Sequence, residues 1–408
     1  MEVVWQRCAG IDIGKRVLAV CLLVGKAKES RTFGTRTADI LRLRDWLKEQ
    51  QCQAIAMEAT GSYWKPLWNV LEDQGMELLL ANPQRIKAVP GRKSDVRDAE
   101  WIADLLRHGL IPKSYVPNRA QRELRELERY RSSLTDERAR EANRLQKVLE
   151  GANLKLGTVL TDITGKSGRA ILRAIAQGKD NPEELANLTV GNVKASKEDL
   201  AEALSGYVGA HQRYMMAMIL DRVDQLDGSI EALDKEIDAR TRPHEEVLQR
   251  LQSIPGIGRR SAQVIVAEVG PDVSHFPSDA HLASWAGLAP GQNESAGKRR
   301  SARIRPGNMT LRSVLVQCAW AAIHSKRTYM HAQYAHLSPR IGKKRAAVAV
   351  ARSLAVIVYH VLAAPEQTYR ELGTDYFERT SNAAIERRAL NQLRRLGYEV
   401  TLNPTSAA

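Results

Sequence analysis

The most informative feature of this sequence is a long stretch without acidic residues. No Asp or Glu lies between Glu294 and Glu366, and these 71 residues carry 13 of the 61 Lys and Arg residues. Removing that stretch leaves 48 basic against 47 acidic residues, so it holds nearly all of the net charge of +14. Concentrated positive charge favours a polyanion, because phosphates attract Lys and Arg and release counterions. We expect a nucleic-acid partner; a solubility role is less favoured, since such charge is usually spread over a surface.

Cysteine is scarce as well, and its spacing shows no metal-ligand pattern. The four cysteines form no CxxC pair and are predicted to be reduced core residues of a cytoplasmic protein: Cys8, Cys21, Cys52 and Cys318. The N-terminus lacks a basic segment followed by an apolar run, so we expect no signal peptide. The most apolar stretch, 346–364, is interrupted by polar and charged residues. It is predicted to be a buried helix, with no membrane partner.

Length predicts two or three domains, and composition predicts that they are folded. A chain of 408 residues exceeds the size at which single cores stop growing, and 43% hydrophobic with 26% charged residues is typical of folded proteins. The expected parts are a mixed α/β domain over 1–115, a long-helix coiled-coil region over 116–250, a helical domain over 251–365 and a tail over 366–408.

The N-terminal domain reads as three strands followed by alternating helices and strands. The expected strands are two within 9–24 joined by a turn at Gly14-Lys15, then 31–35, 53–58 and 76–81. The expected helices are one with Ile40, Leu43, Trp46 and Leu47 at helical spacing, then 63–74 and 94–108. This order predicts a mixed sheet covered by helices, as in ribonuclease-H-like folds, although another α/β sheet would fit as well.

The remainder reads as mostly helical. Long helices are expected over 118–150 and 211–251, and they could pair with each other as an antiparallel arm or with another subunit. Residues 253–270 are typical of a helix-hairpin-helix element. Its Gly256 and Gly258 turn would expose backbone N–H groups to a phosphate, although such an element also serves plain protein structure.

Four acids match the chemistry of a metal-assisted phosphodiester reaction. Asp12 lies inside an apolar strand, where a carboxylate is costly unless a cation or donor offsets it. Glu58 ends the strand 53–58, and Asp95 and Asp98 are three apart at a helix start. If the first and fourth strands are neighbours, Asp12 and Glu58 lie side by side and the helix can close over them. Carboxylates converging in this way would bind Mg²⁺, whereas each acid alone could equally serve a turn, a cap or a helix start.

Motifs at both ends of the chain carry a family resemblance. GIDIGK, MEATGSYW and KSDVRDAEWIADLLRHG come first, and SIPGIG and LASWAGLAPGQNESAGKRRSARIRPGNMTLR follow in the C-terminal half. In this order they resemble the DEDD-type insertion-sequence transposases, over about 9–110 and 251–365. The resemblance implies a RuvC-like N-terminal domain of Holliday-junction-resolvase type, in which Asp12, Glu58, Asp95 and Asp98 bind Mg²⁺.

The same resemblance assigns a nucleophile. From the residues alone, Ser295 is weak evidence, because a serine in a Gly-rich loop usually forms a turn. Cations that could hold a scissile phosphate follow it: Lys298, Arg299, Arg300, Arg303 and Arg305. In the family a C-terminal serine attacks DNA and forms a phosphoserine link, and Ser295 occupies the matching place. Many relatives have two serines before the glycine, whereas Ala296 follows here. Ser301 is the second choice.

Relatives in this family are guided by a structured RNA, which implies DNA and guide-RNA partners. Zinc-finger spacing and RNA-recognition aromatic motifs are absent from the sequence, and delegating sequence choice to base pairing would account for that. The resemblance also implies a dimer or tetramer whose sites unite one subunit's acids with another's serine.

The sequence therefore predicts a DNA transposase or recombinase, with two alternatives. One is a metal-only junction nuclease that hydrolyses DNA with water and needs no serine. The other is a non-catalytic helix-hairpin-helix scaffold that binds nucleic acid.

Overall fold

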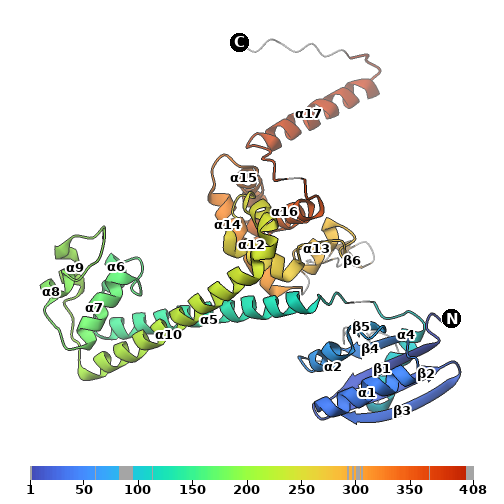
Figure 1. Ribbon diagram of the computed structural model, residues 1–408. Coiled ribbons are helices and arrows are strands. Elements are labelled where there is room, and N and C mark those ends of the chain that lie inside the picture. Colours follow the sequence, from blue (N-terminus) through green and yellow to red (C-terminus); the bar gives the residue numbers. More distant parts are fainter. Residues whose placement is uncertain are drawn as a thin grey trace. The chain divides into compact units, whose positions relative to one another are not determined.

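Figure 1 shows the computed structural model of the chain. The structure describes residues 2–59, 61–81, 95–112, 114–291, 294–295, 298–299, 304, 307–366 and 368–400. For 95–97, 294–295, 298–299, 378–386 and 388 it describes the backbone alone. The chain divides into two compact units, Met1–Arg119 and Ala120–Ala408. The predicted finer division of the second unit stays a prediction.

A five-stranded mixed sheet forms the first unit. Its strands are β1 (Arg7–Ile13), β2 (Val17–Val24), β3 (Ala27–Gly34), β4 (Ala54–Glu58) and β5 (Glu77–Ala81). The order is β3-β2-β1-β4-β5, with β1 to β3 antiparallel and with β4 parallel to both β1 and β5. The predicted mixed sheet is confirmed and is consistent with a ribonuclease-H-like fold. The prediction for β3 was too short, because this edge strand is largely exposed and lacks an apolar alternation.

Helices cover both faces of this sheet. Helices α1 (Thr37–Glu49) and α2 (Trp64–Leu71) pack on one face, where Ile11, Leu18 and Val20 share a core with them. Helix α4 (Asp95–Arg107) packs on the opposite face. Both faces are therefore buried, as the sequence predicts. The four cysteines are free and buried, and burial raises the pKa of Cys8 to about 11.

Two long antiparallel helices form an arm in the second unit (Figure 1). Helix α5 (Arg119–Gly151) runs beside α10 (Ala210–Thr241). Ion pairs join Glu123 to Arg240 at 3.0 Å and Glu137 to Arg222 at 3.3 Å, so residue numbers rise on one helix as they fall on the other. The two helices thus pair with each other. Coiled-coil packing and a role in oligomerisation stay predictions.

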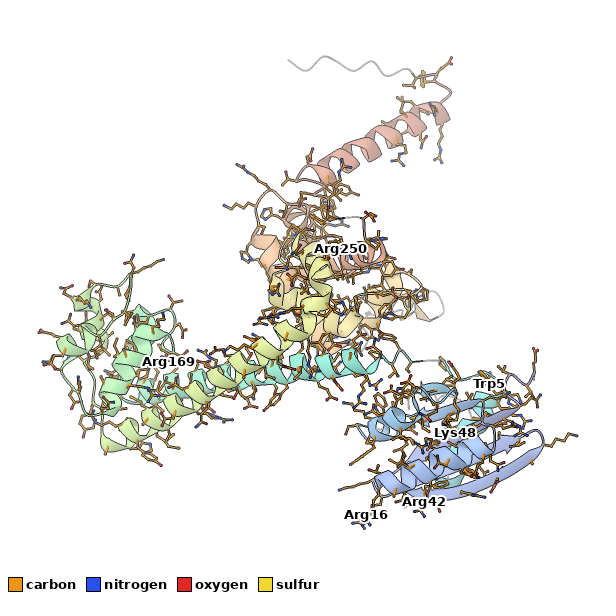
Figure 2. The ribbon with its side chains drawn as sticks, viewed as in Figure 1. Trp5, Arg16, Arg42, Lys48, Arg169 and Arg250 are labelled. Carbon is orange, nitrogen blue, oxygen red and sulfur yellow. The ribbon has the colours of Figure 1, made fainter. Side chains whose placement is uncertain are left out.

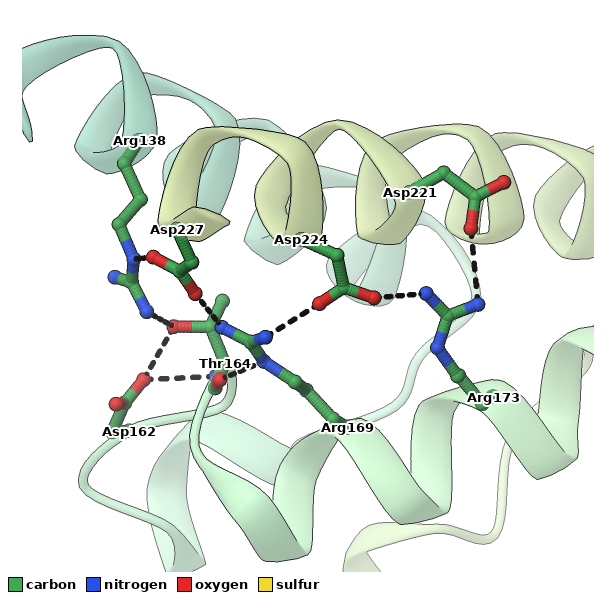
Figure 3. Close-up of polar contacts among 8 residues, drawn as sticks. All are labelled: Arg138, Asp162, Thr164, Arg169, Arg173, Asp221, Asp224 and Asp227. Carbon is green, nitrogen blue, oxygen red and sulfur yellow. Dashed lines mark hydrogen bonds and ion pairs between the residues drawn. The ribbon is translucent and has the colours of Figure 1, made fainter. Parts of the chain in front are cut away.

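A small helical lobe joins the arm helices between residues 151 and 210. It contains α6 (Leu156–Val159), α7 (Lys166–Ala176), α8 (Pro182–Ala186) and α9 (Lys197–Ala203). Arginines of α7 and α5 interleave with aspartates of α10 in the ladder of polar contacts drawn in Figure 3. Within it, Asp227 accepts from both Arg138 and Arg169, and Arg173 donates to Asp221 at 3.0 Å. These charges hold the lobe on the arm.

One predicted helix is wrong in extent. Residues 211–251 were expected to form a single helix, but α10 ends at Thr241 and a short 3-10 turn, η1 (Arg242–His244), separates it from α11 (Glu245–Gln252). Pro243 explains the break, since its ring removes a backbone donor and clashes with the preceding turn of a helix. The chain can therefore change direction between the arm and the following helices.

The remaining helices share one apolar core. They are α12 (Arg259–Val269), α13 (Asp279–Trp285), α14 (Met309–His324), α15 (Tyr329–Ile341) and α16 (Lys343–Ala363). Helix α17 (Tyr376–Arg395) lies in the tail, and none of its described side chains belongs to this core. Among the described residues, α16 is the one helix long and apolar enough to cross a membrane, yet half of its most apolar window is buried. The prediction of a buried helix is confirmed. Arg250, labelled in Figure 2, donates to the Val361 and Ala364 carbonyls at 2.6 and 3.2 Å and so satisfies the end of α16.

Candidate active site

The sheet places Asp12 and Glu58 on neighbouring strands. In the parallel pair of β1 and β4, the register ends at Ile11 opposite Met57, and the two acids are the next residue on each strand. Side chains alternate along a strand, so Asp12 shares a face with Cys8 and Glu58 shares one with Ala56. Cys8 and Ala56 both belong to the core under α4. The two half-buried carboxylates therefore lie side by side on the α4 face, as predicted.

Gly10 determines how closely α4 approaches these acids. A Cβ atom on Gly10 would lie 2.2 Å from the Ala99 carbonyl oxygen and 2.3 Å from the Ala103 nitrogen, so only glycine permits this contact. The Cys8 thiol donates to the Ala103 carbonyl at 3.7 Å. Moving along β1 from Cys8 to Asp12 therefore corresponds to moving along α4 toward its N-terminus. That end carries the other two predicted acids.

Asp95 and Asp98 both belong to the first turn of α4. Asp98 is half-buried, and Asp95 begins the helix, although its side chain is not described. The positive end of the helix dipole points toward the strand ends that carry Asp12 and Glu58, which favours the ionised carboxylates. Sequence spacing had left open which way this helix runs over the sheet.

The donor set fits a hard cation. All four groups are carboxylates, the oxygen ligands that Mg²⁺ prefers. Within the part of the chain that the structure describes, no three His, Cys, Asp or Glu side chains form a metal-holding group; Asp95 lies outside that search. The metal assignment thus rests on strand register, helix direction and donor type.

Ser295 lies in backbone pairing that the sequence did not reveal. Strand β6 (Glu294–Ser295) pairs with β7 (Lys298–Arg299), and Ser295 is directly opposite Lys298. Further out, Pro290 forms a bridge with Ile304. We call the described residues of this paired backbone, 290–291, 294–295, 298–299, 304 and 307, the serine hairpin. Three of the predicted phosphate-binding cations, and the second-choice serine, lie outside the described residues: Arg300, Arg303, Arg305 and Ser301.

The C-terminal end of the serine hairpin is held against α13. The Asn308 N–H donates to the Trp285 carbonyl at 2.9 Å. A Cβ atom on Gly307 would lie 2.4 Å from the Gly287 nitrogen, so the backbones of these two glycines touch. The position of this hairpin end therefore follows that of α13.

The predicted helix-hairpin-helix glycines differ in their surroundings. Gly256 adopts a φ of +86°, and a Cβ atom there would lie 2.3 Å from the Cys318 carbonyl oxygen of α14, so this glycine packs against a helix backbone. Gly258 is exposed and caps the N-terminus of α12. Phosphate binding at this turn stays a prediction for both glycines, with Gly258 the more accessible.

Exposed cations gather on the acid-free segment after the serine hairpin. Within the described residues none of them forms an ion pair, so they are solvated and available to phosphates: Lys326, Arg327, Arg340, Lys343, Lys344, Arg345 and Arg352.

Comparison with known proteins adds two family models. A model for DEDD transposases of the IS110 group, described as a transposase, matches residues 9–154. A second, described as the transposase IS116/IS110/IS902 family, matches residues 248–335. Together they span more than half of the chain, and they include the predicted acids and Ser295.

Individual relatives match over most of their length. The chain is 26% identical to the transposase for insertion sequence element IS1111A of Coxiella burnetii, over 88% of this chain and 90% of the relative. It is 25% identical to the transposase for insertion sequence element IS1328 of Yersinia enterocolitica, over 76% and 82%. It is 24% identical to the pilin gene-inverting protein of Moraxella bovis, over 86% and 94%.

Proposed function

This chain belongs to the IS116/IS110/IS902 family of transposases, and from this premise we propose that it cuts and rejoins DNA through a covalent link to Ser295. Membership makes the protein a DNA recombinase, which removes the non-catalytic scaffold from the alternatives. The family is also one of divalent-metal enzymes. The metal, the serine chemistry and the guide RNA are the proposed refinements.

The acids of the first unit hold the metal in this proposal. Asp12 and Glu58 supply adjacent carboxylates from β1 and β4, and Asp95 and Asp98 add two more from the start of α4. Mg²⁺ bound there supplies positive charge that stabilises phosphate oxygens during displacement. The support is the strand register, which continues to Asp12 and Glu58 as its next pair, and the helix direction set at Gly10.

The serine carries the covalent step. The Ser295 oxygen attacks a DNA phosphorus atom, so an O–P bond forms while the bond from phosphorus to a deoxyribose oxygen breaks. The serine proton passes to solvent, and the leaving deoxyribose oxygen takes up a proton. Attack by another deoxyribose hydroxyl reverses the exchange and rejoins the strand without external energy. The cations around Ser295 offset the negative charge that develops on the phosphate.

Rejoining is favoured over simple hydrolysis by the relatives. Two of them, from Moraxella bovis and Moraxella lacunata, are named pilin gene-inverting proteins and match 86% of this chain. Turning a DNA segment around requires that cut ends be sealed again. A metal-only nuclease would leave its product cut.

The exposed cations support RNA and DNA as partners. Because they lie on a segment without acids, they bind phosphate backbones with little regard to base sequence. A structured guide RNA would then supply the sequence choice by base pairing. We propose that the protein acts as an oligomer, a dimer or tetramer, on this RNA and on both element ends and target.

The single observation that carries the proposal is the pair of family matches, in order, over the acid-bearing sheet and the serine hairpin. The decisive experiment is denaturing electrophoresis of the full chain with labelled element-end DNA, Mg²⁺ and co-expressed flanking RNA. We expect a protein–DNA adduct in the wild type and none in Ser295→Ala. The matched control is Ser301→Ala, which should keep the adduct.

Different outcomes separate the alternatives. Free cut ends without an adduct, unchanged in Ser295→Ala, would establish the metal-only nuclease instead. Asp12→Ala should abolish cutting under either scheme. An adduct that persists in Ser295→Ala but is lost in Ser301→Ala would make Ser301 the nucleophile.

A further inference from the structure

Glu268 is a fully buried carboxylate next to the serine hairpin. It lies near the C-terminal end of α12, in a largely buried part of that helix, and is 0% exposed. A buried charge is costly unless charged and polar partners surround it. A buried acid at this position therefore requires charged or polar neighbours.

Three side chains from two other elements satisfy this carboxylate. Arg129 of α5 donates to both oxygens, at 2.7 and 2.8 Å. Arg125, one turn earlier on α5, lies 3.5 Å from Oε2. The Asn308 amide donates to Oε2 at 2.6 Å. Two guanidinium groups of the arm thus face the carboxylate on one side, and the Asn308 amide donates to it on the other.

Asn308 is the residue at which the serine hairpin becomes α14. Its backbone N–H bonds to the Trp285 carbonyl, and its Oδ1 accepts from the Leu311 N–H at 3.0 Å, which caps the helix. Its remaining amide group is the one that reaches Glu268. One side chain thus ends the hairpin, starts a helix and binds the buried carboxylate.

Arg125 fastens the arm to the same place through further contacts. It donates to the Ala267 carbonyl at 3.0 Å, and its guanidinium lies 5.7 Å from the centre of the Trp285 ring. Trp285 also accepts the Asn308 N–H. The root of α5 and the end of the serine hairpin therefore share Glu268 and Trp285 as common partners.

We propose that Glu268 is a positioning residue for the strand-transfer reaction: it fixes the end of the serine hairpin relative to the arm helix α5. This inference rests on the proposed role of Ser295 as nucleophile. Apolar packing alone would stabilise the contact between α5 and the end of the hairpin. A bidentate ion pair together with a directional amide hydrogen bond also fixes the geometry of that contact. A displacement of the arm root is then transmitted to the hairpin that carries Ser295.

The test is a reversal of the hydrogen bond between Asn308 and Glu268. Asn308→Asp keeps the helix cap but turns the donor into an acceptor, so two carboxylate oxygens meet where one bond was. Glu268→Gln in the same chain restores a donor opposite the new acid and keeps one negative charge for the arginines. Asn181→Asp, at the exposed cap of α8, is the matched control for changing a capping asparagine.

We expect the single variant to slow formation of the protein–DNA adduct by about 10- to 100-fold, the range that a small misplacement of a reacting group produces. The affinity for DNA, measured with the same labelled element ends, should not change. The double variant should recover to within about threefold of the wild type, since its bond is restored with reversed polarity. Amide hydrogen exchange in residues 286–308 should rise in the single variant and fall back in the double.

The inference is overturned if Asn308→Asp forms the adduct at the wild-type rate, or if the double variant recovers neither rate nor exchange protection. An equal slowing in Asn181→Asp would likewise overturn it, because the effect would then be one of capping alone. Absence of any adduct in the wild type refutes the proposed function instead. In that case hydrogen exchange of the hairpin decides the positioning role by itself.

Discussion

Glu128 lies buried in α5 with a carboxyl oxygen that has no hydrogen-bond partner among the described residues. Burial raises the pKa of Glu128 from 4.5 to about 7; Arg131 and Arg260 lower it and Asp234 and Asp238 raise it, but by less than burial does. At about pH 6 the folded protein therefore keeps a proton that the unfolded chain has released.

The sign and size of the consequence follow from linkage. Because the folded state binds the extra proton, the free energy of unfolding decreases as the pH rises from about 4.5 to about 7 and is level above that range. Each unit of pKa difference corresponds to about 1.4 kcal/mol, so the total loss is on the order of 3 kcal/mol. Glu128→Gln removes the titrating group and should remove this loss.

The assay is chemical unfolding of the full chain, followed by helical circular dichroism at several pH values between about 5 and 8. The difference between wild type and Glu128→Gln should grow with pH in favour of the variant. Asp136→Asn, an exposed change on the same helix, is the control and should leave the pH dependence intact. Parallel curves for wild type and Glu128→Gln would refute a buried, protonated carboxyl at this position.

Three further outcomes follow from the structure. Gly10→Ala puts a Cβ atom 2.2 Å from a backbone oxygen of α4. It should lower the free energy of unfolding by about 1–3 kcal/mol, measured by thermal unfolding, and remove most of the DNA-cutting activity. Its control is Gly228→Ala, in open space on α10, which should stabilise the protein by up to about 1 kcal/mol. Burial raises the pKa of Asp227, but hydrogen bonds and charge from Arg169 and Arg138 hold it below its usual range. The stability that Asp227 contributes is therefore present at neutral pH and is lost as the pH falls through the lowered pKa. Asp227→Asn should remove this acid sensitivity, measured by hydrogen exchange in α7. Neutralising Arg299 and Arg300 should weaken DNA or RNA binding in a filter assay and flatten its salt dependence by roughly one to two counterions.

Patterns local to the chain were read correctly from the sequence. Alternation and turn residues predicted β1, β2, β4 and β5, and helical spacing predicted α1, α2 and α4. The edge strand β3 was only partly predicted because most of its side chains are exposed. The prediction of one unbroken helix over 211–251 was wrong. The apolar spacing predicted a helix, but Pro243 interrupts it, because proline removes a backbone donor.

The candidate site shows the same division. The residue types and order of Asp12, Glu58, Asp95 and Asp98 are properties of the sequence, as is the acid-free stretch that follows Ser295. Their adjacency depends on the parallel register of β1 and β4, and the direction of α4 depends on a backbone contact at Gly10.

The amino-acid sequence by itself determined the mixed sheet, the order of the motifs, the family resemblance and the uneven charge. Each of these follows from the residue types within contiguous segments of the chain. Only the tertiary structure decided that Glu268 joins Arg129 to Asn308, and that Ser295 pairs with Lys298. Residues 129, 268 and 308 are far apart along the chain, and the sequence of α12 alone does not indicate which residues contact its buried acid. Their contact results from how α5, α12 and α14 pack, and because Glu268 is fully buried its carboxylate requires polar partners.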